Sequence, residues 1–126
     1  MKEIEFRLDV PLKAKARPRF GKGRSFMPKE YMEWKNTTRD HLKQLWVDFD
    51  LPTLELFEME VEAHGPGRCD ADNLLGALLD SGIPDKKTGW AGAWKDDRVT
   101  VIPFVSLRWI RSKEQFWVVR LRILSP

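Results

Sequence analysis

Three segments of this chain largely alternate apolar with polar residues, and they constrain its fold more than any other feature. They run from Ile4 to Val10, from Phe57 to Ala63 and from Trp117 to Ile123. Successive side chains of a strand point to opposite faces of a sheet, so each segment is predicted to form a strand with one buried face. The polar face of the second strand consists of glutamates, which we expect to be solvated or paired with Arg and Lys of a neighbouring strand.

Two further segments have the spacing of amphipathic helices. The longer one is predicted to begin at Pro28, which suits the first position of a helix, and to end before Pro52. The shorter one is predicted to run from about Asp72 to Ser81. The apolar stripe of the longer helix consists of Tyr31, Trp34, Thr38, Leu42, Leu45 and Phe49, and that of the shorter helix of Leu74, Leu75, Leu78 and Leu79.

The segments between these elements are predicted to be irregular or extended. Residues 12–27 contain Pro and Gly among several cations, which favours a long loop or a loose hairpin. Residues 82–95 are predicted to be irregular, and residues 99–110 to be extended, with Pro103 at an edge position or a bulge. The resulting order predicts one α+β domain over residues 1–126, with a small mixed β-sheet flanked by two main helices.

Composition excludes several classes of protein. The chain is 42% hydrophobic and 33% charged, which is ordinary for a globular domain and unlike a disordered chain. No apolar run approaches the ~18 residues that span a membrane, and the N-terminus has no signal-peptide pattern. The single cysteine, Cys69, permits neither a disulfide framework nor a thiolate metal site. We therefore expect a cytoplasmic protein without a membrane segment.

Charge is distributed unevenly along the chain. The net charge is only +3, but no acidic residue occurs between Val10 and Lys29, and residues 45–66 contain no Lys or Arg. Cationic segments commonly contact phosphate backbones, although a solvated charged loop is the alternative interpretation. The basic residues concerned are Lys13, Lys15, Arg17, Arg19, Lys22, Arg24 and Lys29.

Acidic residues gather just before the second predicted helix. Asp70 and Asp72 are separated by one residue, and Asn73 follows them. In an extended backbone, residues i and i+2 point to one side, so both carboxylates can reach a single ion. Hard cations such as Mg²⁺ prefer oxygen ligands, and the distant pair Asp96 and Asp97 could add to the set. The alternative is structural: an Asp at this position caps the helix, and the distant pair forms an ordinary turn.

Several features favour a metal site over the structural alternative. One residue suffices to cap a helix, yet three carboxyl or amide groups crowd this start, and like charges brought together need a compensating cation. Arg68, Lys95 and Arg98 flank the two acidic stretches and suit an approaching phosphate. Neither His41 nor His64 has the neighbours typical of a catalytic triad or a zinc site, so we expect both to be structural.

The order and the motifs of this chain resemble the RusA-like Holliday-junction resolvases, a family of small Mg²⁺-dependent endodeoxyribonucleases common in phages and prophages. The resemblance covers nearly the whole chain, and its motifs are short but specific in combination. It is carried by the basic stretch 13–19, the start of the first helix at 28–35, the acidic motif 68–74, Leu78-Leu79-Asp80 and Asp96-Asp97-Arg98-Val99.

The resemblance implies a RusA-like fold with a metal-dependent nuclease site. It implies that Asp70, Asp72 and Asp97 are the catalytic carboxylates that bind the metal, with Asp96 as a supporting ligand. The implied cofactor is Mg²⁺, with Mn²⁺ as a substitute, and the implied partners are a second copy of the chain and branched DNA. Such a homodimer nicks two strands of a four-way junction symmetrically, in DNA recombination and repair within a bacterial host. The expected DNA contacts are Lys13, Lys15, Arg17, Arg19, Lys22, Arg24, Lys29, Arg68 and Lys95.

One position departs from the family pattern. The family usually carries a lysine four residues after the second Asp of the motif, where this chain has Gly76. Either Lys86, Lys87 or Lys95 replaces that lysine, or turnover is reduced. Two further functions therefore stay open: a branched-DNA-binding protein with weak or no catalysis, and a nucleic-acid accessory factor whose acidic residues only cap helices and form ion pairs.

The stretch from Asp85 to Trp94 looks longer than the connection that the family has at this place. Its Trp90 and Trp94 could stack on unpaired bases at a junction. They could equally cover a dimer interface or a hydrophobic core, and we expect one of these two uses.

Overall fold

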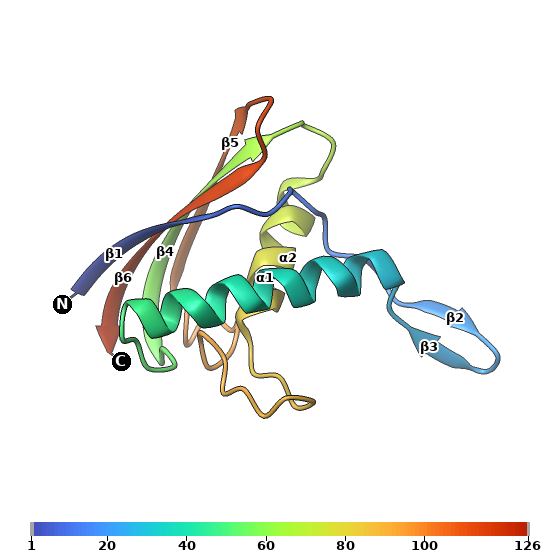
Figure 1. The fold of residues 1–126 in the computed structure, drawn as a ribbon, viewed down its shortest axis with the longest axis horizontal. Coiled ribbons are helices and arrows are strands. Elements are labelled where there is room, and N and C mark those ends of the chain that lie inside the picture. The colour runs from blue at the N-terminus through green and yellow to red at the C-terminus, as the bar shows by residue number, and fades with distance from the viewer. Residues whose placement is uncertain (1, 126) are drawn as a thin grey trace.

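The three alternating segments form neighbouring strands, as their pattern predicts. The structure is a computed structural model that describes residues 2–125, and Figure 1 shows its elements. The predicted α+β class is confirmed: two helices accompany a mixed four-stranded sheet, and a separate hairpin is present. The strands are β1 (Lys2–Leu8), β2 (Arg19–Gly21), β3 (Arg24–Phe26), β4 (Leu56–Gly65), β5 (Phe104–Arg111) and β6 (Phe116–Ser125), and the helices are α1 (Lys29–Asp48) and α2 (Ala71–Gly82).

The four-stranded sheet has the order β1–β6–β4–β5. β6 is antiparallel to both of its neighbours, whereas β4 and β5 are parallel. A parallel pair needs a long crossover, which α2 and the irregular residues 83–103 supply. β5 lies at the edge of the sheet, in agreement with Pro103 just ahead of it. The strand is shorter than expected, because it begins at Phe104 rather than near Val99.

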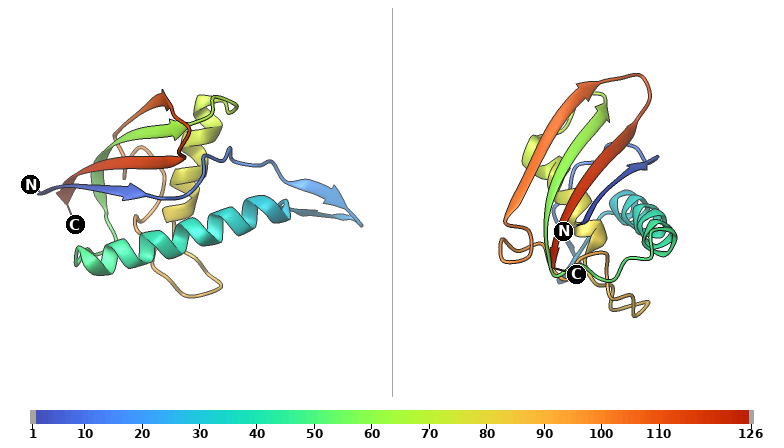
Figure 2. Two further views of the ribbon diagram at one scale, coloured as in Figure 1. Left: turned by 45° about the horizontal axis from the view of Figure 1, so that its top comes forward. Right: turned by 90° about the vertical axis from the view of Figure 1, so that its left-hand side faces the viewer.

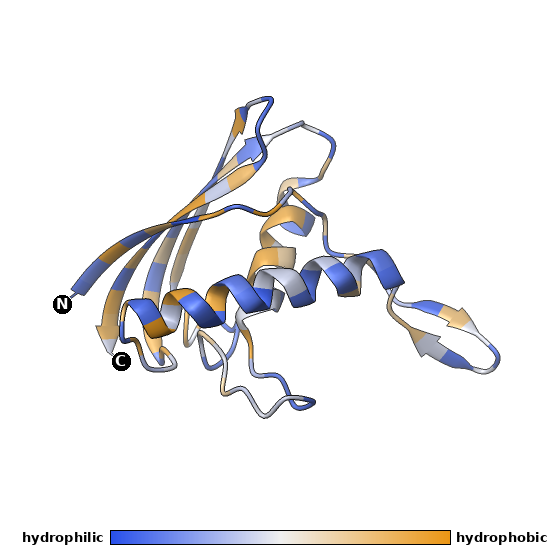
Figure 3. Cartoon of the chain, in the orientation of Figure 1, coloured by the Kyte–Doolittle hydropathy of each residue, from blue (hydrophilic) through white to orange (hydrophobic). Residues whose placement is uncertain are grey.

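One face of the sheet is covered by the helices and carries the core (Figure 2). Its inward side chains include Val61 on β4 and Trp117 and Val119 on β6, all of which are buried. Figure 3 shows the same alternation as bands of hydrophobic and hydrophilic residues along the strands. Burial of this apolar face is the main favourable contribution to folding.

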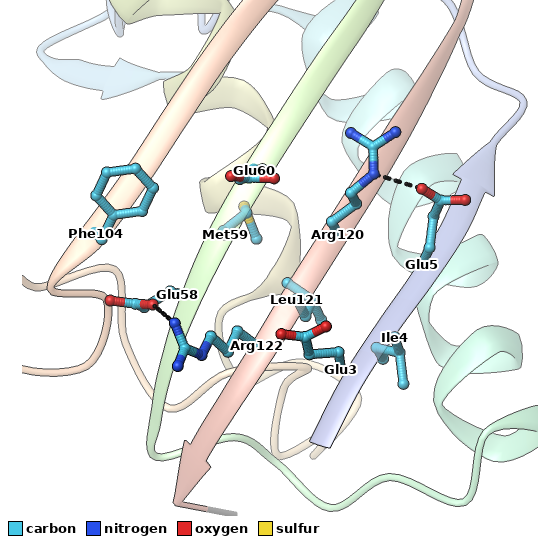
Figure 4. Close-up of a pocket in the computed structure, with 10 residues that line it drawn as sticks. All are labelled: Glu3, Ile4, Glu5, Glu58, Met59, Glu60, Phe104, Arg120, Leu121 and Arg122. Atoms are coloured by element: carbon cyan, nitrogen blue, oxygen red, sulfur yellow. Dashed lines mark hydrogen bonds and ion pairs between the residues drawn. The ribbon is translucent and has the colours of Figure 1, made fainter. Parts of the chain in front are cut away.

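The other face of the sheet is polar and open, and Figure 4 shows the shallow pocket that lies on it. Arg120 Nη1 lies 3.1 Å from Glu62 Oε2, and Arg122 Nη1 lies 3.6 Å from Glu58 Oε1. The predicted pairing of the β4 glutamates with cations of a neighbouring strand is therefore confirmed. Exposed ion pairs of this kind contribute little to stability, so the buried face holds the sheet in place.

α1 begins one residue later than predicted. Pro28 has an extended ψ of 140° and precedes the helix, whose first residue is Lys29. The predicted stripe does pack inward, but it is wider than expected, because Arg39 and Trp46 are also buried. The stripe residues are buried at Tyr31, Trp34, Thr38 and Leu42 and partly buried at Leu45 and Phe49.

No helix within residues 2–125 is long and apolar enough to cross a membrane.

Trp94 belongs to the hydrophobic core. Its side chain is fully buried, and its indole Nε1 donates a hydrogen bond to Leu79 O at 3.0 Å. The ring packs so closely on Gly82 that a Cβ there would lie 2.1 Å from ring carbon Cζ2. Trp90 is partly buried, and Lys43 Nζ lies 5.4 Å from the centre of its ring. Of the uses considered for the two residues, a place in the core is confirmed for Trp94.

Candidate functional site

The turn before α2 is fixed by close packing at two glycines. β4 ends at Gly65, and the Trp109 ring of β5 packs on Gly67, where a Cβ would lie 2.9 Å from Cζ2 of that ring. Trp109 Nε1 also donates a hydrogen bond to Gly65 O at 3.1 Å. Because Gly67 has no room for a side chain, the chain leaves the sheet at a defined place and brings Asp70 to the start of α2.

Asp70 occupies the N-cap position of α2, with φ −71° and ψ 144°. Its main-chain oxygen accepts a hydrogen bond from Leu74 N at 2.9 Å, but its carboxylate makes no capping bond with the helix. Asp72 lies in the first turn, and both residues are exposed. Asp70 therefore occupies the capping position, as the structural alternative predicts, but its side chain does not cap the helix. The carboxylate of Asp70 stays available to another ligand near the positive end of the helix.

Asp96 and Asp97 lie in a turn that is attached to the start of β4. Lys95 N donates a hydrogen bond to Leu54 O at 2.9 Å and so fixes one end of the turn. Asp96 Oδ1 accepts a hydrogen bond from Asp97 N at 2.8 Å, and its Oδ2 lies 2.9 Å from Arg98 Nε. Burial and the nearby carboxylate of Asp96 raise the pKa of the Asp97 carboxyl. Asp96 therefore builds the turn, as the structural alternative predicts.

The two acidic stretches do not form a ready metal site. Within residues 2–125, no group of three His, Cys, Asp or Glu side chains is placed to hold an ion. Asp70 follows the end of β4, whereas the turn with Asp97 is attached to the start of that strand through the hydrogen bond from Lys95 to Leu54. The metal assignment of Asp70, Asp72, Asp96 and Asp97 stays a prediction. By donor type, Asp70 and Asp72 suit Mg²⁺, which is often held by one or two carboxylates together with substrate phosphates.

Lys15 is the cation that the fold places against α2. Its main-chain N donates a hydrogen bond to Asn73 O at 2.8 Å. Its side chain passes Gly76, where a Cβ would lie 3.5 Å from Lys15 Cδ. The positive charge of Lys15 acts to lower the pKa of both Asp80 and Asp97. Lys15 therefore lies beside the middle of α2, within electrostatic reach of carboxyl groups from two distant parts of the chain.

Two of the three loop lysines that could have compensated for Gly76, Lys86 and Lys87, have other neighbours. Lys86 and Lys87 line a cleft of about 460 Å³ between α1 and the turn after α2, together with Lys43 of α1. The atoms that a Cβ at Gly76 would meet within 4 Å belong to Lys15. The sequence singled out Lys15 only as a DNA contact, whereas the structure makes it the cation adjacent to Gly76.

A buried carboxylate on α2 joins the two helices. Asp80 is 9% exposed, and its Oδ2 accepts a hydrogen bond from Tyr31 Oη at 2.7 Å and lies 3.0 Å from Lys35 Nζ. Burial alone would raise the pKa of Asp80, but these hydrogen bonds and the charges of Lys35 and Lys15 hold it below its usual value. Asp80 belongs to the motif Leu78-Leu79-Asp80, but the sequence pattern does not predict its partners Tyr31 and Lys35. An Asp beside the apolar stripe of a helix requires such a buried partner.

The expected DNA contacts differ in their surroundings. Lys13 Nζ lies 3.8 Å from Glu30 Oε2, and Lys29 Nζ lies 3.7 Å from Glu33 Oε1. Arg68 and Lys95 are exposed beside the two acidic stretches. The cations in and just before the β2–β3 hairpin are also exposed, and within residues 2–125 no acidic side chain pairs with them; they are Arg17, Arg19, Lys22 and Arg24.

His64 has the structural surroundings that its sequence context predicts. His64 stacks on Phe116 with ring centres 4.2 Å apart, and its Nε2 lies 3.2 Å from Glu62 Oε1, whereas His41 is exposed on α1.

No protein-family model matches the chain, and no curated protein matches it. The family resemblance therefore depends on the motifs of the chain alone.

Proposed function

We propose that this chain is a Mg²⁺-dependent, structure-selective endodeoxyribonuclease of the RusA-like type, which resolves Holliday junctions or related branched DNA. The observation that carries the proposal is the start of α2, where Asp70 and Asp72 are exposed and the Asp70 carboxylate makes no capping bond. Lys15, a cation of the basic segment, is hydrogen-bonded to the same helix through Asn73. Carboxylates suited to a metal thus lie at the start of a helix against which a cation suited to a phosphate packs.

The residues have distinct proposed roles. Asp70 and Asp72 are proposed to hold the metal together with substrate phosphates, and Asp97 is proposed as a third carboxylate, which Asp96 supports by forming the turn. Mg²⁺ or Mn²⁺ bound there supplies Lewis-acid stabilisation of the charge that develops when water attacks a phosphodiester. Lys15 meets the negative charge of the phosphate, because its side chain passes Gly76 and is not enclosed by the protein.

The charge distribution supports a nucleic-acid substrate. The cations in and before the hairpin have no acidic partner within residues 2–125, so their charges are available to phosphates. Contacts of this kind give affinity that falls with salt and depends little on base sequence. A second copy of the chain is proposed to act on the opposite strand, which makes the nicks paired and symmetric.

A branched-DNA-binding protein with weak or no catalysis is the second candidate. Two observations favour it: no three-carboxylate group is formed within residues 2–125, and Gly76 stands where the family usually has a lysine. Its DNA contacts are the same as those of the nuclease, so cleavage is the property that separates the two candidates.

Incubation of the protein with a synthetic four-way junction and with linear duplex, with and without Mg²⁺, separates them. We expect nicks in the junction only and with the metal only, and we expect Asp70→Asn and Asp72→Asn to abolish them. Glu55→Gln is the matched control, because Glu55 is an exposed acidic residue just before β4. Tight junction binding without nicks in Mg²⁺ or Mn²⁺ would favour the binding protein. Equal affinity for junction and duplex would contradict both candidates.

A further inference from the structure

The β2–β3 hairpin stands away from the rest of the fold. Its strands pair only with each other, over three residue pairs, and it projects beyond the start of α1 (Figures 1 and 2). An isolated two-stranded hairpin is only marginally stable in water. A tight turn helps to define this one, because Lys22 and Gly23 at its tip have φ of 50° and 74°, as a type I′ turn requires. The hairpin is thus a defined but exposed arm.

Phe20 on β2 is the most exposed large hydrophobic residue within residues 2–125, with 84% of its surface accessible. The other aromatic residue of the hairpin is used within it: the Phe26 ring lies across Gly21, where a Cβ would be 3.2 Å from Cε1. Phe20 pairs with Ser25 across the two strands, and the side chains of this pair point to the face opposite to that of Phe26. An exposed phenyl ring on a projecting arm gains free energy when a partner covers it.

The charges of the arm indicate the kind of partner. Arg19 and Arg24 lie on the two strands, on the face opposite to Phe20, and Lys22 lies at the tip. None of the three has an acidic partner in the part of the chain that the structure describes. A second hairpin packed on this one would bring like charges together, which is unfavourable. Cations along a phosphate backbone, combined with an aromatic side chain for a base, are a common way to bind unpaired nucleotides.

We propose that the hairpin inserts at the branch point of a DNA junction, with Phe20 of one face stacked on an unpaired base, and with Lys22 of the tip and Arg19 and Arg24 of the opposite face on phosphates of the strands beside it. This inference rests on the proposed function, because it takes branched DNA as the ligand. It adds a contact that recognises the branch itself, since the bases of an intact duplex are already stacked on one another.

The chain connects this contact with the carboxylate site. Lys15 is hydrogen-bonded to α2, and the chain continues from it directly to Phe20. Between these two residues an extended chain covers at most about 17 Å, which corresponds to roughly five nucleotides of a strand. The nick is therefore expected within about five nucleotides of the branch point.

The inference is tested by measuring the affinity of the protein for a junction. Ca²⁺ replaces Mg²⁺ in this measurement so that the junction is bound without being cleaved. A 2-aminopurine base at the branch point reports stacking through its fluorescence. Phe20→Ala and Phe20→Leu are expected to weaken junction binding about tenfold or more, the scale of one base–aromatic stack. Both variants are expected to lose the 2-aminopurine response and to bind linear duplex as the wild type does. Phe20→Trp is expected to retain both properties.

Two controls separate stacking from charge and from general surface effects. Phe104→Ala is the matched control, because Phe104 is 48% exposed on β5, on the open face of the sheet. Lys22→Ala is expected to reduce the slope of log affinity against log salt by about one, whereas Phe20→Ala leaves the slope unchanged. Because Phe20 is exposed, Phe20→Ala is expected to unfold at the same temperature as the wild type, so that a loss of binding is not a loss of folding.

The possible results lead to different conclusions. Wild-type junction affinity and fluorescence response in Phe20→Ala would overturn the inference and leave the proposed function standing. A smaller oligomer in Phe20→Ala with unchanged DNA binding would also overturn it, because Phe20 would then mediate contact between copies of the chain. A wild-type protein that does not prefer the junction over duplex would overturn the proposed function together with this inference.

Discussion

Because Lys15 lies against Gly76, two substitutions can transfer the cation beside the proposed site from position 15 to position 76. A Cβ at position 76 would lie 3.5 Å from Lys15 Cδ and 3.8 Å from Lys15 Cβ, which is ordinary van der Waals contact. The position therefore accepts a side chain. Lys15→Ala removes the native cation, and the double variant Lys15→Ala, Gly76→Lys restores a cation from the helix itself.

The exposure of Lys15 sets the expected size of the effect. Unit charges 4 Å apart interact by about 1 kcal/mol in bulk water and by about 4 kcal/mol near a protein surface. Lys15 is exposed, so its contact with a phosphate belongs in the lower part of this range, about 1–2 kcal/mol. Each 1.4 kcal/mol of barrier corresponds to about a tenfold change in rate. Lys15→Ala is therefore expected to slow cleavage roughly 5- to 30-fold.

The rate of the cleavage step is measured in single-turnover cleavage of a four-way junction at saturating protein. Gly76→Ala is the control: cleavage is expected to be unchanged, and the free energy of unfolding is expected to rise by about 0.5–1 kcal/mol, because Ala replaces a glycine inside α2. The double variant is expected to recover most of the rate that Lys15→Ala loses. A wild-type rate in Lys15→Ala, or a double variant as slow as Lys15→Ala, would refute the reasoning.

Three further predictions concern stability. Tyr31→Phe removes the 2.7 Å hydrogen bond to Asp80 and is expected to lower the free energy of unfolding by about 1–3 kcal/mol in urea titrations. The pKa of folded Asp80 lies below its ordinary 3.8, so its stabilising contribution is present above that pH and is lost as the pH falls towards the folded pKa. Asp80→Asn is expected to reduce the loss of unfolding free energy at acid pH. An unchanged dependence of the unfolding free energy on pH would contradict the proposed contribution of Asp80. Gly82→Ala is expected to cost about 3 kcal/mol in thermal unfolding, because its Cβ would lie 2.1 Å from the Trp94 ring; a wild-type Tm would contradict this packing.

Local patterns predict the central strands well, because alternation is a property of neighbouring residues and each strand has one buried face. The same rule fails at the start of β5. Val101 and Ile102 are buried although they lie in a turn before the strand. Their apolar character reflects packing under the sheet, and Val101 O accepts a hydrogen bond from Phe57 N at 3.0 Å. Composition alone therefore places the strand too early.

The candidate site is predictable in its residues but not in its contacts. The sequence places Asp70 before a helix, but it does not reveal that the carboxylate makes no capping bond. The contact of Lys15 with Gly76 joins two distant segments, so no spacing rule anticipates it. The aromatic residues show the same limit, because Trp94 is buried and Phe20 is exposed through tertiary packing that neither residue type determines.

Mapping of nicks on a synthetic four-way junction tests the central proposal most directly. Each strand is end-labelled in turn, incubated with the protein and Mg²⁺, and resolved on a denaturing gel. The proposal predicts paired nicks at symmetry-related positions of two opposing strands, within about five nucleotides of the branch point, and none with Asp72→Asn. A junction that is bound but uncut in both Mg²⁺ and Mn²⁺, or a linear duplex that is cut as readily as the junction, would contradict it.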